Sequence, residues 1–129
     1  MQNENNAEAN KSLITDFFKF LEQGDVEKIR ALISDNVRWW AQGKGVMTKD
    51  EFCTNTERNV ALTTKRIATI KRLIAEGDNI HALVSTEFTF QDQRVLKNEM
   101  SLSGEIQNGQ ITNLAEFMDI DAVRAFFGG

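Results

Sequence analysis

The chain has 129 residues, of which 41% are hydrophobic and 26% are charged, a balance that excludes a disordered chain. Its 15 basic and 19 acidic residues give a formal net charge of -4. Because proteins that follow nucleic-acid phosphates need clustered positive charge, we expect no nucleic-acid partner.

Residue usage also limits the chemistry. The chain has one histidine (His81), one cysteine (Cys53) and no tyrosine, which excludes Cys/His zinc sites and multi-histidine metal sites. We therefore expect no metal and no cofactor. A single cysteine cannot form an internal disulfide, and together with a polar start that is unlike a signal peptide it favours a cytoplasmic location. No apolar run approaches the roughly 18 residues that cross a bilayer, so no membrane association is expected.

The first third of the chain is helical in pattern. Residues 1–9 are polar and are expected to form a disordered tail. From Asn10 onward apolar residues recur at helical spacing, and Gly24 ends this first helix. Asp25 is placed to cap a second, short helix.

A strand and a third helix follow. Residues 37–42 are rich in β-formers and are predicted to be a strand. Thr48 and Glu51 have the spacing of a capping box, in which each side chain bonds the other residue's amide. The helix that they open is predicted to end near residue 62.

Beyond this helix the apolar period changes from 3.6 to 2, which indicates strands. Asn108-Gly109 is a strong hairpin signal, and Asp119 is placed to cap a terminal helix that ends at Phe127. The four predicted strands cover residues 65–75, 80–90, 94–106 and 111–118.

This order of elements predicts one α+β domain over residues 10–129, with a curved antiparallel sheet wrapped around N-terminal helices. Such a sheet forms a cone with an internal pocket. In residues 80–90 the even positions carry the apolar set and are expected to face inward. In residues 111–118 both faces are mixed, so we expect a homodimer that covers the outer face of the sheet.

Several segments resemble the nuclear-transport-factor-2-like superfamily, which has a cystatin-like cone fold. The resemblance extends over about residues 10–127 and is greatest to the SnoaL-like group, which includes polyketide cyclases, ketosteroid isomerases and limonene-epoxide hydrolases. It implies a mostly apolar pocket for a small hydrophobic ligand. The segments that carry it are residues 17–25, 35–40, 74–78 and 108–119.

The catalytic residues of ketosteroid isomerases are not retained. Their tyrosine falls on Phe17, their general-base aspartate on Ala41, and their neutral aspartic acid near Ser101 or Leu102. The chain is therefore not expected to be a standard ketosteroid isomerase.

The limonene-epoxide hydrolase pattern is kept in part. Its Arg-x-Asp falls on Ser85-Thr86-Glu87, and its second aspartate falls on Glu116. The tyrosine and asparagine that hold its water fall on Trp39 and Ala41. Two carboxylates thus survive with longer side chains, while the arginine and the water-holding pair are lost.

Glu116 and Glu87 are accordingly the candidate catalytic residues. Glu116 lies on the same strand face as Leu114 and Met118, and an apolar pocket disfavours its charged form. With Glu87 as partner, one carboxyl could activate water while the other protonates a leaving oxygen. The resemblance turns Glu87 inward, whereas strand alternation turns it outward, and both interpretations stay open.

The resemblance implies that seven residues line the pocket, with Asn98 as a polar anchor. They are Phe17, Trp39, Asn98, Met100, Leu102, Leu114 and Met118. Trp40 should lie on the opposite face of the sheet from Trp39. His81 is expected at the surface, and Cys53 in the core.

Three functions are compatible with the sequence. The first is a cofactor-free hydrolase, isomerase or cyclase that acts on a small hydrophobic molecule through Glu116. The second is a module that binds such a molecule without changing it. The third is a protein-interaction module that uses the outer face of the sheet.

Overall fold

The computed structural model describes residues 2–128, with side chains from residue 6 onward. Its helices are α1 (Gln2–Gln23), α2 (Val26–Ala31), α3 (Lys49–Leu62) and α4 (Ile120–Phe126). Its strands are β1 (Ile33–Ala41), β2 (Gly45–Met47), β3 (Thr63–Glu76), β4 (Asn79–Phe90), β5 (Val95–Gln107) and β6 (Gln110–Met118).

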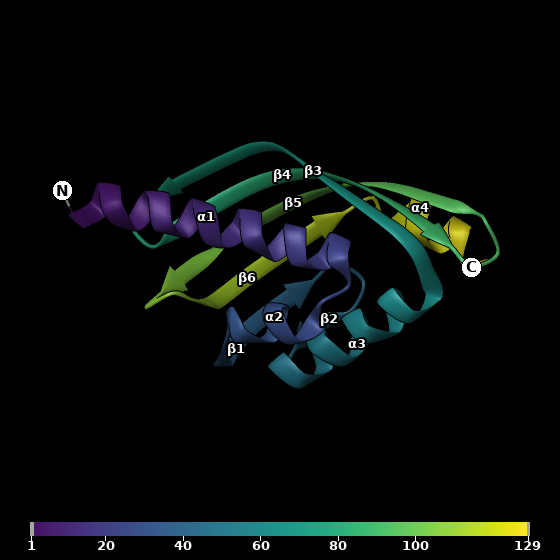
Figure 1. The fold of residues 1–129 in the computed structure, drawn as a ribbon, viewed down its shortest axis with the longest axis horizontal. Helices are drawn as coiled ribbons and strands as arrows, with labels where there is room; N and C mark the ends of the chain where they lie inside the picture. Colours follow the sequence, from purple (N-terminus) through teal and green to yellow (C-terminus); the bar gives the residue numbers. More distant parts are fainter. Residues whose placement is uncertain (1, 129) are drawn as a thin grey trace.

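These strands form one sheet in the order β2-β1-β6-β5-β4-β3. Strands β3 to β6 are joined by short turns and pair antiparallel, whereas β1 pairs parallel with β6. The sheet curves around α1, which crosses its concave face, while α2 and α3 lie at the end near β1 and β2 (Figure 1). The predicted α+β fold, a curved sheet around N-terminal helices, is confirmed.

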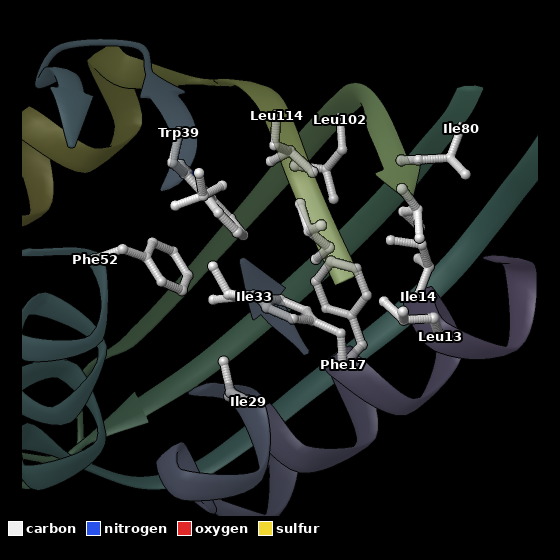
Figure 2. Close-up of a cluster of buried hydrophobic side chains, with 14 of the residues drawn as sticks. Leu13, Ile14, Phe17, Ile29, Ile33, Trp39, Phe52, Ile80, Leu102 and Leu114 are labelled. Carbon is white, nitrogen blue, oxygen red and sulfur yellow. The ribbon is translucent and has the colours of Figure 1, made fainter. Parts of the chain in front are cut away.

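The hydrophobic core lies between the concave face and the helices. Along β4 the even residues Ile80, Ala82, Val84 and Thr86 are buried, as strand alternation predicts. Figure 2 shows how side chains from α1, α2, α3 and the strands meet in this core. The side chains that it labels are Leu13, Ile14, Phe17, Ile29, Ile33, Trp39, Phe52, Ile80, Leu102 and Leu114.

The predicted helix caps are present. Asp25 accepts a hydrogen bond from the Lys28 amide at 3.1 Å, and Asp119 accepts one from the Ala122 amide at 3.1 Å. Thr48 and Glu51 form the capping box that opens α3. Three short polar side chains therefore set where α2, α3 and α4 begin.

Two boundaries of the structure differ from those expected. Helix α1 extends from Gln2 to Gln23, whereas the first helix was expected from Asn10 after a tail over residues 1–9; Met1 lies outside the described residues. The buried side chain of Asn10 donates a hydrogen bond to the Gly77 carbonyl at 3.2 Å, which holds this part of the helix against the β3–β4 turn. Strand β1 begins at Ile33, because its pairing with Ile111 on β6 extends it beyond the predicted start.

Candidate active site at Glu116

Glu116 lies on the inner face of β6. It is opposite Leu102 on β5 and Ala41 on β1, and its backbone carbonyl accepts a hydrogen bond from the Gln42 amide at 2.9 Å. Strands on both sides thus fix the backbone of Glu116. Its side chain points to the concave side of the sheet, as the prediction for this strand required.

The Glu116 carboxyl group accepts a hydrogen bond at Oε1 from Nε1 of Trp39, at 3.1 Å. Burial raises the pKa of this carboxyl above its ordinary value, while the Trp39 hydrogen bond and the positive charge of Lys44 act in the opposite direction. Desolvation is the largest of these effects. Glu116 is therefore easier to protonate than an exposed glutamate.

The second carboxyl oxygen, Oε2, differs from Oε1. No hydrogen bond from a described residue reaches it, yet no buried side-chain nitrogen or oxygen within residues 6–128 lacks a partner. Oε2 therefore keeps contact with solvent. One oxygen of the carboxyl is held by the protein, and the other is available to a ligand or water.

The rings beside Glu116 are tightly packed. Trp39 is only 2% exposed, stacks on Phe52 with ring centroids 3.8 Å apart, and has Phe17 at 5.8 Å; Phe17 and Phe52 are 6.2 Å apart, so the three rings form one cluster. Figure 2 shows Trp39 and Phe52 turned toward each other at one end of the core. Phe17, Trp39, Leu102 and Leu114, which were expected to line a pocket, are therefore members of the hydrophobic core.

The remaining expected pocket residues lie closer to solvent. Met100 and Met118 are partly buried and face each other across β5 and β6. Asn98 is not a free polar anchor, because its side chain exchanges hydrogen bonds with the backbone of Asp119 at 3.0 and 3.4 Å. It fastens the start of α4 to β5, which strand alternation alone could not indicate.

Glu87 lies on the outer face of the sheet. It belongs to the odd set of β4, is half-exposed, and forms an ion pair with Lys97 at 3.9 Å. Of the two interpretations left open for Glu87, the structure has the outward one that strand alternation indicates, because the even residues of β4 fill the core. The structure brings Glu116 together with Trp39 and not with Glu87.

Glu116 does not line either of two surface hollows formed by described residues. The larger, of about 480 Å³, lies between α3 and the β1–β2 loop and includes Lys44 and Arg58. The smaller, of about 230 Å³, lies over β3, β4 and β5 and includes Glu87 and Asn98.

The solved structures with similar folds cover nearly the whole chain. A protein of unknown function from Burkholderia pseudomallei, described as NTF2-like, is 14% identical with a TM-score of 0.81, over 94% of this chain and 98% of that one. An LEH-like epoxide hydrolase of M. tuberculosis is 14% identical with a TM-score of 0.78, over 95% and 98%. A Catenulispora acidiphila protein with a ketosteroid isomerase-like fold, in complex with trimethylamine, is 14% identical with a TM-score of 0.76, over 88% and 89%.

The chain has the nuclear-transport-factor-2-like fold. The resemblance noted in the sequence is thus confirmed for the architecture. No protein-family model matches the chain, and no curated protein matches it by sequence.

Two residues beside Glu116, Gln42 and Lys44, were not singled out by sequence reasoning. Gln42 accepts a hydrogen bond from the Met118 amide at Oε1, at 3.0 Å. Lys44 donates to Asn55 of α3 at 3.1 Å and acts on the charge of Glu116. Their only sequence signal is that they directly follow the strand that carries Trp39.

The other reactive side chains lie away from Glu116. His81 is exposed on β4, and Cys53 is buried in α3, where burial raises the pKa of its thiol. Over the described residues, no cluster of His, Cys, Asp or Glu has the arrangement of a metal site. Within the same residues, no helix is both long and apolar enough to span a membrane.

Proposed function

We propose that this protein acts on a small hydrophobic molecule by acid/base chemistry at Glu116, without a cofactor. The observation that carries the proposal is the desolvated carboxyl of Glu116, which Trp39 holds at Oε1 and which reaches solvent at Oε2. Carboxyl groups with a raised pKa in apolar surroundings are suited to proton transfer near neutral pH. Met100 and Met118, both partly exposed, supply apolar contact for a ligand.

A single carboxyl favours one kind of reaction within this proposal. Hydrolysis by a carboxylate pair needs one group to activate water and another to protonate the leaving oxygen, and Glu87 is on the wrong face to assist. Glu116 alone can take a proton from one position of a substrate and return it at another. A proton-transfer isomerisation, such as that of an unsaturated ketone, therefore suits the geometry better than hydrolysis. The LEH-like neighbour is an epoxide hydrolase, so epoxides belong in the test.

The test is proton exchange and turnover on a defined panel in D2O, followed by NMR. The panel contains apolar β,γ-unsaturated ketones, cyclic epoxides and lactones. Glu116→Gln should lower the rate on any active compound by about 100-fold or more. Glu87→Gln, the same change on the outer face, should leave the rate unaltered. Equal rates for wild type and Glu116→Gln would remove Glu116 from the mechanism.

A second candidate is a module that binds a ligand without changing it. The loss of the arginine, tyrosine and asparagine of the epoxide hydrolase pattern favours it, because their positions hold Ser85, Trp39 and Ala41 here. A panel compound that binds and is recovered chemically intact after long incubation would support this candidate. A compound that is consumed would exclude it.

We also propose that the protein is a homodimer through the outer face of the sheet. Trp40 and Phe117 lie together there with ring centroids 5.0 Å apart, and Phe117 is 47% exposed. Val46, on the neighbouring strand β2, is exposed as well. Aromatic side chains exposed on a sheet face are typical of protein interfaces. A cytoplasmic location, which the single free cysteine favours, is part of the same proposal.

A further inference from the structure

We infer that Trp39 is a positioning residue for Glu116, which reserves Oε1 for its indole N–H and makes Oε2 the oxygen that exchanges a proton with the ligand. The inference rests on the proposed function, since it assigns roles to the two oxygens of the same carboxyl. It starts from the 3.1 Å hydrogen bond between Trp39 Nε1 and Glu116 Oε1.

The position of the indole is fixed by the fold. Trp39 pairs with Leu114 across the parallel β1–β6 ladder, and Ala41 pairs with Glu116. Trp39 therefore projects from β1 beside the carboxyl, on the same face of the sheet. Phe52 at 3.8 Å and Phe17 at 5.8 Å pack against the ring, and they also pack against each other at 6.2 Å. With 2% of its surface exposed, Trp39 has little freedom to turn away from Glu116.

The chemistry of indole then selects one oxygen. The indole N–H donates and cannot accept a hydrogen bond. In a neutral carboxyl group the carbonyl oxygen is a stronger acceptor than the hydroxyl oxygen, so the indole N–H favours Oε1 as the acceptor whether Glu116 is ionised or neutral. When Glu116 is protonated, the proton lies on Oε2, the oxygen that reaches solvent. Trp39 thus directs the acidic hydrogen outward, toward a bound molecule.

The charged groups around Glu116 do not change which of its two oxygens carries the proton. Lys44, from the β1–β2 loop, is the charged group among the described residues that acts on Glu116, and it favours the ionised form. Its amine donates to Asn55 Oδ1 at 3.1 Å. The indole therefore remains the group that distinguishes Oε1 from Oε2.

The first test uses Trp39 itself as a reporter. The chain has two tryptophans and no tyrosine, so Trp40→Phe leaves Trp39 as the only source of indole fluorescence. Trp39 emission should change with pH at the same midpoint at which the Glu116 carboxyl carbon titrates by NMR. The change should disappear when Glu116→Gln is added to Trp40→Phe. Emission that stays constant while that carbon titrates, or an identical change in both proteins, would overturn the inference.

The second test removes the donor. In Trp39→Phe the ionised carboxyl loses a hydrogen bond that stabilises it, so the NMR midpoint of Glu116 should shift upward, and kcat should fall more than KM rises. Trp40→Phe, the same substitution on the other face, should leave the midpoint unchanged. An unchanged midpoint in folded Trp39→Phe would contradict the assignment, and if that variant fails to fold, the fluorescence test decides.

Failure of the inference can be separated from failure of the proposed function. Neither the fluorescence change nor the NMR midpoint requires a substrate. Coupled titration of Trp39 and Glu116 in a protein that turns over nothing would uphold the pairing and reject catalysis. Turnover that depends on Glu116 while Trp39 shows no response would uphold catalysis and reject the positioning role.

Discussion

Arg66 donates a hydrogen bond from Nε to the carbonyl oxygen of Leu21, at 3.0 Å, and so joins β3 to the last turn of α1. Its Nη1 also donates to the carbonyls of Val60 and Thr63 and to Oγ1 of Thr63, at 3.5, 3.3 and 2.6 Å. The last carbonyls of a helix have no partner within the helix. One partly buried guanidinium therefore completes the C-terminal ends of both α1 and α3.

Arg66→Ala should destabilise the protein by about 1–3 kcal/mol, because the carbonyls of Leu21, Val60 and Thr63 lose a charged donor together, although Leu21 keeps the Gly24 amide and Val60 the Thr63 amide. Urea unfolding followed by circular dichroism measures the change. Arg72→Ala, an exposed position on the same strand, is the matched control and should lie within about 0.5 kcal/mol of wild type. Equal losses in the two variants would mean that the capping bonds of Arg66 contribute little.

Gly104→Ala should be among the more damaging single-methyl substitutions. A Cβ at this position would lie 2.2 Å from the carbonyl oxygen of Asn113 and 3.0 Å from Cα of Leu114. Because these are backbone atoms of the paired strand β6, relief requires that the two strands separate, at a cost of about 1–3 kcal/mol or more. Thermal unfolding checks this, with Ser103→Ala as the exposed neighbour for comparison. A melting temperature equal to that of Ser103→Ala would show that β5 and β6 can move apart at Gly104 with little loss of stability.

Glu116→Gln should change how stability depends on pH. Below the ordinary pKa of 4.5 the carboxyl is protonated in both folded and unfolded chains. As the pH rises, the unfolded chain loses this proton first, so stability is lost until the pH passes the raised pKa of the folded state. Wild type should therefore lose stability relative to Glu116→Gln as the pH rises above 4.5, as measured by urea unfolding.

Glu51→Gln is a control for this experiment, because its expected change of stability with pH has the opposite sign. The Thr48 backbone hydrogen bond lowers the pKa of Glu51, so its ionised form adds stability above its ordinary pKa and loses it as the pH falls through the folded pKa. The stability of wild type should increase relative to that of Glu51→Gln as the pH rises. If the stability difference between wild type and variant changed with pH in the same direction for Glu116→Gln and Glu51→Gln, the pH dependence would not come from these individual carboxyl groups.

Phe117→Lys should convert the proposed dimer to a monomer, because it places a charge beside Trp40 at the centre of the exposed aromatic pair. Sedimentation velocity at micromolar concentration measures the mass. Leu62→Lys, at an exposed apolar position at the end of α3, should keep the mass of wild type. Wild-type protein that sediments as a monomer would contradict the dimer.

Local signals in the sequence were sufficient for most of the fold. The capping box at Thr48 and Glu51 depends on residues three apart, and the alternation along β4 depends on the pleat of a strand. For Glu87 that alternation indicated the correct face, whereas the resemblance to epoxide hydrolases did not. Interactions governed by short spacing could be predicted because the chain itself brings these residues together.

The candidate site could be predicted only in part, since its contacts join distant segments. Glu116 was identified from its strand face, but its hydrogen bond with Trp39 spans 77 residues and depends on parallel pairing of β1 with β6. The bonds of Asn98 to Asp119 and of Arg66 to two helix ends depend in the same way on how strands and helices dock. The spacing of residues along the sequence does not predict these long-range contacts.

The first helix has a consequence for self-association. Strand β3 is an edge of the sheet. Long edge strands carry amides and carbonyls that are not paired within the sheet, and a strand of another chain can pair with them. Helix α1 packs along β3, and Glu22 accepts a hydrogen bond from the Ala68 amide at 2.8 Å. Shortening the chain from its N-terminus through α1 would uncover this edge, so the product should form sheet-extended aggregates in place of a smaller folded domain.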